Sequence, residues 1–330
     1  HGCGMSVMEM SHRGSLFQEI HAGAKEKLRS LLSVPSSHDI LFMQGGATGQ
    51  FSAVPLNLMG EGPAVYAVTG NFSGIAAREA AKYGKVLRAF DGGAESYRRI
   101  PRQSELKLER GAAYFHYCAN NTIYGTAWDY VPEAGVPLVC DMSSEILSHP
   151  VEVGRYRLIY AGAQKNMAPA GLTVAIIERA ALGRERPDTP QVLNYRLMSA
   201  KDSMLNTPPC WCIYMLGLVL DWVEEQGGVA EMDRLRRERS SLLYEVLGNS
   251  RVYRAHAEEG SRSCMNVTFR TGSEELDAEF VKGAAERGLL NVKGHRLTGG
   301  MRASLYNAMP IEGAKALAQY MKDFEVAHHV

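Results

Sequence analysis

Short hydrophobic runs alternate with longer amphipathic stretches through the first two thirds of the chain. Six of these runs have the length of a buried strand, at 40–43, 64–69, 114–117, 137–140, 158–161 and 172–177. Apolar residues recur at helical spacing over 19–32 and 73–83, which predicts helices there. Because strands and helices alternate, we expect an α/β fold whose main sheet is mostly parallel.

The last hundred residues have a different pattern. Charged helix and loop sequence covers 224–250, and two further strands are predicted at 266–270 and 302–306. Helical patterns at 273–287 and 312–324 flank these strands. A chain of 330 residues also exceeds the size at which one hydrophobic core usually stops growing. We therefore predict two domains, a large one at 1–232 and a smaller α+β domain at 233–330.

Composition and charge narrow the classes of partner. Hydrophobic residues make up 45% of the chain and charged residues 22%, as in ordinary soluble enzymes, and the formal net charge is zero. This balance predicts neither nucleic acid nor an anionic membrane as a partner. The longest apolar run, 211–223, is broken by Gly217 and Asp221, so it indicates a buried helix rather than a membrane span.

The six cysteines are scattered, and only Cys210 and Cys212 lie close together. Their spacing predicts no metal site and no disulfide framework, and it is typical of cytoplasmic thiols. No signal peptide is visible. The chain opens at His1-Gly2-Cys3-Gly4, which is untypical of a natural start, so we expect an N-terminal piece to be missing.

Polar residues gather where the predicted strands end. In open parallel sheets the carboxyl edge is where ligands bind. Six segments of this kind follow strands or turns, namely Ala47-Thr48, Asn71-Phe72, Asn121-Thr122, Asp141, Gln164-Lys165 and Asn206-Thr207. The sequence therefore predicts a binding site at this edge.

Two of these residues have the chemistry that a pyridoxal phosphate (PLP) enzyme needs. Lys165 ends a buried strand, where desolvation lowers the pKa of an amine and favours an imine. Asp141 ends the preceding strand, and a buried carboxylate stays ionised only beside a cation such as a protonated pyridine ring. An ordinary ion pair at a sheet edge explains the same spacing equally well.

Three further groups could bind anions or an aromatic ring. The small-residue turn 45–50 could hold a phosphate on its backbone N–H groups, or it could be a plain tight turn. It matches neither a Walker loop nor a dinucleotide fingerprint. Phe72 could stack on a planar ring or belong to the core. Asn206-Thr207, before Pro208-Pro209, could present polar groups to an anion or cap the next helix.

Arginine and histidine occur together in two places. His12-Arg13 and His295-Arg296, with Arg302 after the second pair, would suit a substrate that carries both a carboxylate and a phosphate. Scattered surface charge is the alternative. The nearby Gly294 and 299–300 favour a shaped loop at the second pair.

Taken together, these segments resemble the phosphoserine aminotransferase family of class V PLP-dependent aminotransferases. The matching stretches occur in the family's order along nearly the whole chain, at 4–13 (GMSVMEMSHR), 44–50 (QGGATGQ), 140–144 (CDMSS), 160–166 (YAGAQKN), 206–209 (NTPP), 294–296 (GHR) and 299–304 (GGMRAS). The resemblance implies PLP-dependent transferase fold type I, with a seven-stranded sheet in the large domain.

The resemblance also implies roles for individual residues. Lys165 would be the Schiff-base lysine and Asp141 the partner of the pyridinium nitrogen. The other cofactor-binding residues would be Ala47, Thr48, Phe72, Thr122 and Gln164, with Asn206 and Thr207 reaching the cofactor of the neighbouring subunit in a homodimer. The substrate clamp would consist of His12, Arg13, His295, Arg296 and Arg302.

The implied reaction transfers the amino group of L-glutamate to 3-phosphohydroxypyruvate, giving O-phospho-L-serine and 2-oxoglutarate in L-serine biosynthesis. A second substrate, 4-phosphohydroxy-L-threonine of pyridoxine biosynthesis, is open. Other hypotheses are an alanine–glyoxylate aminotransferase, a desulfurase-like lyase, a nucleotide-binding dehydrogenase and an inactive PLP-binding scaffold. A desulfurase needs a catalytic Cys on a mobile loop, which none of the six clearly is, and a dehydrogenase needs the absent fingerprint.

Three departures from the family pattern stand out. The family's Asn-Phe-x-x-Gly-Pro segment, which precedes the first matching stretch, is absent here. Phe72 replaces a ring-stacking Trp, which we expect to weaken cofactor binding modestly. Asn121 stands where the family often has Glu, and the sequence does not say what this changes.

Overall fold

The computed structural model describes residues 2–328, and its largest element is a seven-stranded mixed sheet. The strand order is β1-β9-β8-β7-β4-β2-β3. Only β9 runs antiparallel to its neighbours, so the sheet is mostly parallel as predicted. Its strands are β1 (His38–Met43), β2 (Ala64–Val68), β3 (Val86–Asp91), β4 (Tyr114–Cys118), β7 (Leu138–Asp141), β8 (Tyr156–Gly162) and β9 (Thr173–Glu178).

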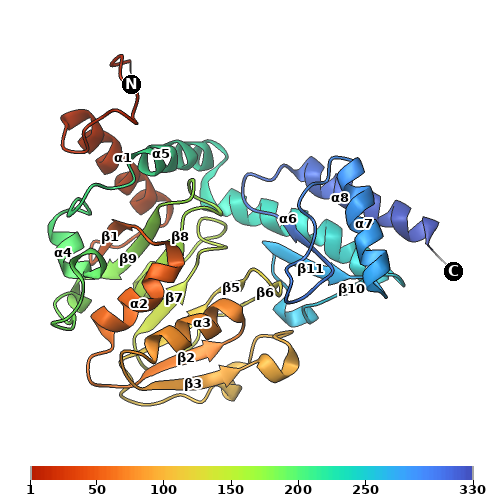
Figure 1. Cartoon of the computed structure of the whole chain (residues 1–330), viewed down its shortest axis with the longest axis horizontal. Helices are drawn as coiled ribbons and strands as arrows, with labels where there is room; N and C mark the ends of the chain where they lie inside the picture. Colours follow the sequence, from red (N-terminus) through yellow and green to blue (C-terminus); the bar gives the residue numbers. More distant parts are fainter. Residues whose placement is uncertain (1, 329–330) are drawn as a thin grey trace.

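Helices cover both faces of this sheet (Figure 1). They are α1 (Ser15–Leu31), α2 (Gly46–Leu58), α3 (Asn71–Ala80), α4 (Tyr195–Ala200) and α5 (Cys210–Glu225). In β1, Ile40 and Phe42 pack into the core shared with α1 and α5, whereas Leu41 and Met43 pack into the core shared with α2, α3 and α4. Successive strand residues face opposite sides, so a strand buried on both faces is hydrophobic throughout.

A second, smaller sheet lies beside the first and belongs to the C-terminal part of the chain (Figure 1). It consists of β10 (Arg254–Ala255), β11 (Asn266–Arg270) and β12 (Met301–Ser304), all antiparallel. Helices α6 (Gly228–Asn249), α7 (Glu274–Glu286) and α8 (Ile311–Ala327) form a separate hydrophobic core with it. The predicted boundary at residue 232 falls in the first turns of α6, and the division into two domains stays a prediction.

A short hairpin connects the two sheets. It consists of β5 (Asn120–Asn121) and β6 (Thr126–Ala127), and its turn packs on β11. Gly125 has φ +69°, and a Cβ there would lie 2.7 Å from the carbonyl oxygen of Asn266. Only glycine combines this backbone conformation with so close an approach. Thr268 Oγ1 also donates to the carbonyl of Ile123 at 3.1 Å, so the hairpin is held against the small sheet.

The predicted elements differ from the observed ones mainly at their ends. The strand expected at 302–306 is Met301–Ser304, and the turn expected at 45–50 is already the start of α2 from Gly46 onward. Strands β3, β5, β6 and β10 and helix α4 had no counterpart in the prediction. The expected missing segment would join at His1, which lies outside the described residues.

Candidate active site

The carboxyl edge of the large sheet holds a cavity of about 180 Å³ at the ends of β4, β7 and β8 and the start of α2. It is lined by Gly46, Ala47, Thr48, Phe51, Phe72, Cys118, Asn120, Thr122, Asp141, Ser143, Ser144, Gln164 and Lys165. Seven of the nine residues predicted to bind the cofactor are among them. The strand-end argument therefore located the cavity, because parallel strands bring residues far apart in sequence to one edge.

Lys165 enters this cavity from the segment that follows β8. Its Nζ donates to Thr122 Oγ1 at 2.8 Å and lies 5.7 Å from the centre of the Phe72 ring. Burial lowers the pKa of Lys165 below its ordinary value, and the charge of Asp141 only partly opposes this shift. The amine therefore loses its proton more readily than an exposed lysine does, so more of it is in the neutral form that acts as a nucleophile or a base.

Asp141 is the last residue of β7, and only 7% of it is exposed. Both hydrogen bonds from Ser143, from its backbone N–H at 2.9 Å and from its hydroxyl at 2.6 Å, go to Oδ1. The other oxygen, Oδ2, has the thiol of Cys118 at 3.9 Å. Burial raises the pKa of Asp141 above its ordinary value. A cation placed at Oδ2 would relieve this cost.

The N-terminus of α2 forms another wall of the cavity. Gly45 (φ +90°) and Gly46 (φ +62°) turn the chain sharply from β1 into the helix, which is where Ala47 and Thr48 lie. The unpaired N–H groups and the dipole of a helix N-terminus favour an anion such as a phosphate. Buried Gln50 accepts from Tyr195 Oη at 2.7 Å and anchors this helix start to α4.

Arg302 reaches the same region from the small sheet. Its Nη1 lies 3.5 Å from the carbonyl oxygen of Thr122, and its charge contributes to lowering the pKa of Lys165. Its Nε is buried without a hydrogen-bond partner among the described residues. Burial, followed by the charges of Arg302 and Arg296, lowers the pKa of His295. Arg296 and Arg302 both lie near enough to His295 for their charges to act on it, although none of the three residues lines the cavity.

Besides His295, Arg296 and Arg302, four predicted residues lie outside the cavity lining. Asn206 and Thr207 are exposed on the loop before α5, and Gln44 Nε2 donates to the carbonyl of Thr207 at 3.0 Å. His12 and Arg13 belong to the N-terminal segment before α1 and do not line the cavity either. Their predicted roles, like those of the other site residues, stay predictions.

Several lining residues had not been singled out from the sequence. Ser143 and Ser144 follow Asp141 and belong to the matching stretch 140–144, so their position beside an aspartate was a usable signal. Cys118 is the last residue of β4 and Asn120 is the first residue of β5. Both lie in a buried region, so no local sequence pattern distinguished them. Their side chains reach the cavity only because β4 lies next to β7 in the sheet.

Asn121 stands where the family often has Glu, and its buried side chain connects two segments. Its Nδ2 donates to Thr69 Oγ1 at 3.2 Å and to Thr126 Oγ1 at 3.1 Å. These contacts tie the end of β2 to the short hairpin that carries Thr122. A neutral amide performs this function without burying an additional charge.

Known proteins resemble this chain in sequence and in fold. The family model of the class-V aminotransferases matches residues 1–317. Phosphoserine aminotransferases from Laribacter hongkongensis and Pseudomonas fluorescens are 49% and 51% identical to the chain, covering 99% of it and 92% and 91% of their own lengths. The solved phosphoserine aminotransferase from Bacillus circulans subsp. alkalophilus is 41% identical with a TM-score of 0.96, covering 98% of this chain and 91% of that one.

A PLP-bound phosphoserine aminotransferase from Trichomonas vaginalis is 38% identical, with a TM-score of 0.93 over 97% of this chain and 92% of that one. The fold and the site therefore define a fold type I aminotransferase of class V. Within that class, the chain belongs to the phosphoserine aminotransferase family.

Proposed function

We propose that this chain transfers the amino group of L-glutamate to 3-phosphohydroxypyruvate, giving O-phospho-L-serine and 2-oxoglutarate in L-serine biosynthesis. The chain is a PLP-dependent transaminase of the phosphoserine aminotransferase family. The observation that carries the proposal is the meeting of Lys165, Asp141 and the α2 N-terminus in one cavity, with Arg302 in contact with the lining residue Thr122. A second substrate, 4-phosphohydroxy-L-threonine, carries a phosphate group too and would present the same anion to Arg302.

The residues around the cavity fit pyridoxal phosphate. The under-bonded Oδ2 of Asp141 suits a protonated ring nitrogen, and the α2 N-terminus with Ala47 and Thr48 suits the phosphate. Gln164 lines the same cavity, and Phe72 offers a ring for stacking. When bound, the cofactor withdraws the electrons that the substrate Cα holds after losing its proton.

Lys165 has two functions in this proposal. Its amine would hold the cofactor, and as a neutral base it would take the proton from the substrate Cα. Both functions need a neutral amine, and burial favours that form. Thr122 accepts a hydrogen bond from Nζ, which fixes the direction from which the amine acts. Asp141 would hold the proton on the cofactor's ring nitrogen.

Substrate selection belongs to the arginine and histidine groups. Arginine binds phosphate and carboxylate with two parallel hydrogen bonds, and the buried Nε of Arg302 has no hydrogen-bond partner among residues 2–328. Because His295 is mostly neutral, it can donate or accept a hydrogen bond beside Arg296 without adding further charge. His12 and Arg13 would complete the clamp from the N-terminal segment.

We also propose that the enzyme is a cytoplasmic homodimer with shared active sites, in which Asn206 and Thr207 reach the partner's cofactor phosphate. Helix α5 supports this because it exposes large apolar side chains, with Trp211 and Leu218 each 44% exposed. Leu218 and Trp222 also line an open, largely apolar cavity of about 510 Å³ that extends to Lys165. Apolar surface of this kind is typical of a subunit interface.

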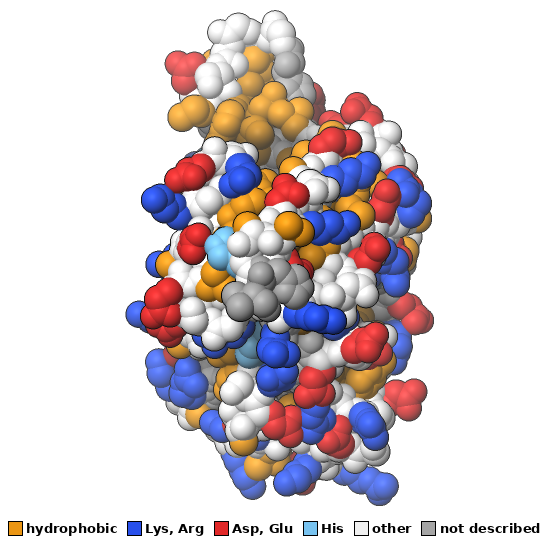
Figure 2. Space-filling model, turned by 90° about the vertical axis from the view of Figure 1, so that its right-hand side faces the viewer, with side chains coloured by type: hydrophobic (Ala, Val, Ile, Leu, Met, Phe, Trp, Pro, Cys, Tyr) orange, Lys and Arg blue, Asp and Glu red, His pale blue; other side chains and the backbone are white. Residues whose placement is uncertain are grey.

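Figure 2 shows further hydrophobic side chains gathered on the projecting end of the molecule, where Figure 1 places the N-terminal segment. Met5 and Met8 there are 52% and 76% exposed. This second apolar surface continues towards Trp211 and Tyr214 of α5 and is a further candidate for the subunit contact. Within residues 2–328, no helix is long and apolar enough to span a membrane.

A steady-state assay tests the proposed function. Purified protein with added PLP receives 2-oxoglutarate and one amino donor, either O-phosphoserine, serine or alanine, and glutamate formation is measured. We expect turnover with O-phosphoserine and a kcat/KM at least about a hundredfold lower for the other two, because they lack the phosphate that the arginines bind. A preference for alanine would favour an alanine–glyoxylate type of enzyme instead.

A further inference from the structure

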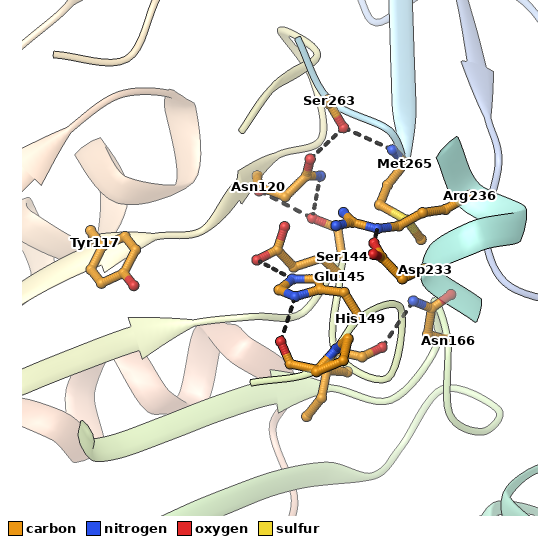
Figure 3. Close-up of polar contacts among 12 residues, drawn as sticks. Tyr117, Asn120, Ser144, Glu145, His149, Asn166, Asp233, Arg236, Ser263 and Met265 are labelled. Atoms are coloured by element: carbon orange, nitrogen blue, oxygen red, sulfur yellow. Dashed lines mark hydrogen bonds and ion pairs between the residues drawn. The ribbon is translucent and has the colours of Figure 1, made fainter. Parts of the chain in front are cut away.

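Asn120 is a buried side chain at the junction of the two sheets, and nothing in the proposed mechanism uses it. It is 6% exposed and immediately precedes Asn121 and Thr122 in the connecting hairpin. Figure 3 shows its amide between two serines that come from opposite sides. Its Oδ1 accepts from Ser263 Oγ, and its Nδ2 donates to Ser144 Oγ at 2.8 Å.

One side of Asn120 leads to the cofactor cavity. Ser144 Oγ donates back to the backbone carbonyl of Asn120 at 3.1 Å, so the two residues hold each other by two hydrogen bonds. The neighbouring Ser143 binds Asp141 and also accepts from the backbone N–H of Gly162 at 3.0 Å. The segment held by Asn120 is therefore the one that orients Asp141.

The other side leads to the strand that carries Arg302. Asn120 Nδ2 also donates to Asn266 Oδ1 at 2.8 Å. The amide nitrogen of Asn266 lies 3.2 Å from Ser304 Oγ and 3.3 Å from Tyr306 Oη. Ser304 pairs with Asn266 across β11 and β12, and Arg302 is two residues earlier on β12. Arg302 returns to the hairpin through its contact with the carbonyl of Thr122.

We infer that Asn120 is a positioning residue that sets the distance between Arg302 and the groups that act on the substrate Cα. This inference rests on the proposed function, because Arg302 is taken there to bind an acidic group of the substrate. If Arg302 binds the acidic group of the substrate while Lys165 acts on its Cα, the distance between these two side chains must match the length of the substrate. A displacement of about 1 Å can cost about a hundredfold in rate.

The amide group of asparagine suits this position for a chemical reason. Ser263 presents a hydroxyl donor to Asn120, whereas Asn266 presents an oxygen acceptor. The amide of Asn120 has an acceptor, Oδ1, and two donor hydrogens on Nδ2, so it can bind Ser263 and Asn266 at the same time. Aspartate would place an oxygen against Asn266 Oδ1, and alanine would leave buried polar groups on both sides without partners.

Asn57 provides a matched control for buried asparagine in general. It is 3% exposed, donates to the carbonyls of Ala53 and Leu193, and accepts from the backbone N–H of Tyr195. All these partners belong to the large sheet and its helices, far along the chain from Arg302. Replacing Asn57 should lower stability without changing how substrate is held.

A double-mutant cycle between Asn120 and Arg302 tests the inference. Asn120→Ala, Arg302→Ala, the double variant and Asn57→Ala are compared in kcat and KM for O-phosphoserine, with the thermal unfolding midpoint measured for each. Asn120→Ala should raise KM about tenfold in the wild-type background and add little once Arg302 is absent. Asn57→Ala should lower the midpoint and leave KM unchanged.

Binding without turnover gives a second readout. In a Lys165→Ala background, calorimetry of O-phosphoserine binding should show the same coupling, with Asn120→Ala weakening the affinity only when Arg302 is present. If Asn120→Ala does not fold, Ser263→Ala keeps the Asn120 amide and removes its hydrogen bond to Oδ1, together with the two that Ser263 Oγ accepts from the backbone N–H groups of Met265 and Asn266. It should give the same coupling at smaller amplitude. Additive effects of the two positions on KM and on affinity would overturn the inference.

The two levels of the proposal fail in different ways. If the wild-type enzyme does not use O-phosphoserine, the proposed function is wrong and the inference falls with it. If the wild-type enzyme does use it but Asn120 and Arg302 act independently, the function stands and only the positioning role of Asn120 is rejected.

Discussion

At the scale of single residues, Asp141 carries a buried charge that destabilises the cofactor-free protein and that a bound cation would stabilise. The carboxylate is buried, and Ser143 satisfies only one of its two oxygens with strong hydrogen bonds. Its folded-state pKa is raised from 3.8, so the stability it contributes is present below pH 3.8 and lost as pH rises through the folded pKa. At neutral pH the cofactor-free protein therefore carries a penalty at this position.

This penalty gives the first prediction. In cofactor-free protein at pH 7, Asp141→Asn should raise the thermal unfolding midpoint, because the amide keeps the Oδ1 contacts and removes the buried charge. With the cofactor, the same variant should lose about a hundredfold or more in kcat, since a neutral amide cannot hold the ring-nitrogen proton. Calorimetry and steady-state kinetics measure the two effects.

Asp277 provides the control for Asp141. It is similarly buried, at 6% exposed, and its Oδ1 accepts from the backbone and hydroxyl of Thr271 in the small sheet's unit. Asp277→Asn should leave kcat unchanged. A cofactor-free Asp141→Asn protein that is less stable than wild type would contradict the account of the buried charge.

Phe72 carries the second prediction at this scale. Its ring is 39% exposed and lies over Lys165 at the mouth of the cavity. Phe72→Trp should tighten PLP binding by about 0.5–1.5 kcal/mol, because an indole offers a larger stacking face. Phe72→Leu should weaken binding. Equilibrium dialysis against PLP measures both effects. Equal PLP affinities with Trp, Phe and Leu at this position would show that ring stacking does not contribute to binding.

At the scale of elements, the segment after β2 packs so closely on the hairpin that adding one methyl group should disturb the contact. Gly70 caps α3, and a Cβ there would lie 2.5 Å from Asn121 Oδ1 and 3.0 Å from its Cγ. Gly70→Ala should therefore displace the hairpin and Thr122, destabilise the protein by about 1–3 kcal/mol and weaken cofactor binding. Denaturant unfolding and PLP dialysis measure the two effects.

Gly74 is the matched control on the same helix. A Cβ there would meet Arg78 Nη1 at 3.4 Å and Val68 Cγ1 at 3.5 Å, which is ordinary contact. Gly74→Ala should be neutral or slightly stabilising, because alanine favours a helix over glycine. Equal loss of cofactor affinity in both variants would show that the close approach of Gly70 to Asn121 has no special importance.

The elements also show what could be predicted from the sequence and why. Strands buried on both faces, such as β7 and β8, are hydrophobic throughout, so their ends and the polar residues after them were visible. Strand β3 was missed because it is half exposed at the sheet edge and carries Arg88 and Asp91. The hairpin was missed because two-residue strands such as β5 leave no periodicity.

Long-range pairing set a second limit to prediction. Cys118 and Asn120 lie at the cavity because β4 is hydrogen-bonded to β7, a neighbour 20 residues or more later in the chain. No local pattern encodes that neighbour. The roles predicted for Lys165 and Asp141, by contrast, rest on residue type and position at a strand end, together with the resemblance of the surrounding motifs to one family.

At the scale of the whole molecule, the proposed dimer makes a prediction about mass and cofactor together. The 36.2 kDa chain should have twice that mass in sedimentation or light scattering. Leu218→Asp, on the exposed face of α5, should give monomers that bind PLP more weakly, because Asn206 and Thr207 would no longer reach a partner. Burying a charge in an apolar contact is costly, which is the reason to expect dissociation.

Leu290→Asp is the control for the dimer. Leu290 is 67% exposed and belongs to the C-terminal unit, so the variant adds the same charge elsewhere on the surface. It should remain dimeric with unchanged PLP affinity. A monomeric wild-type protein with full activity would contradict shared active sites.

The most direct test of the central claim is a half-reaction followed by absorbance, with no amino acceptor present. O-phosphoserine, serine and alanine are added separately to the PLP-loaded protein, and conversion of the bound aldehyde cofactor to its amine form is recorded. The account predicts rapid conversion with O-phosphoserine, much slower conversion with serine and alanine, and none in Lys165→Ala. Faster conversion with alanine or serine, or no protein-bound cofactor even after PLP is added, would contradict it.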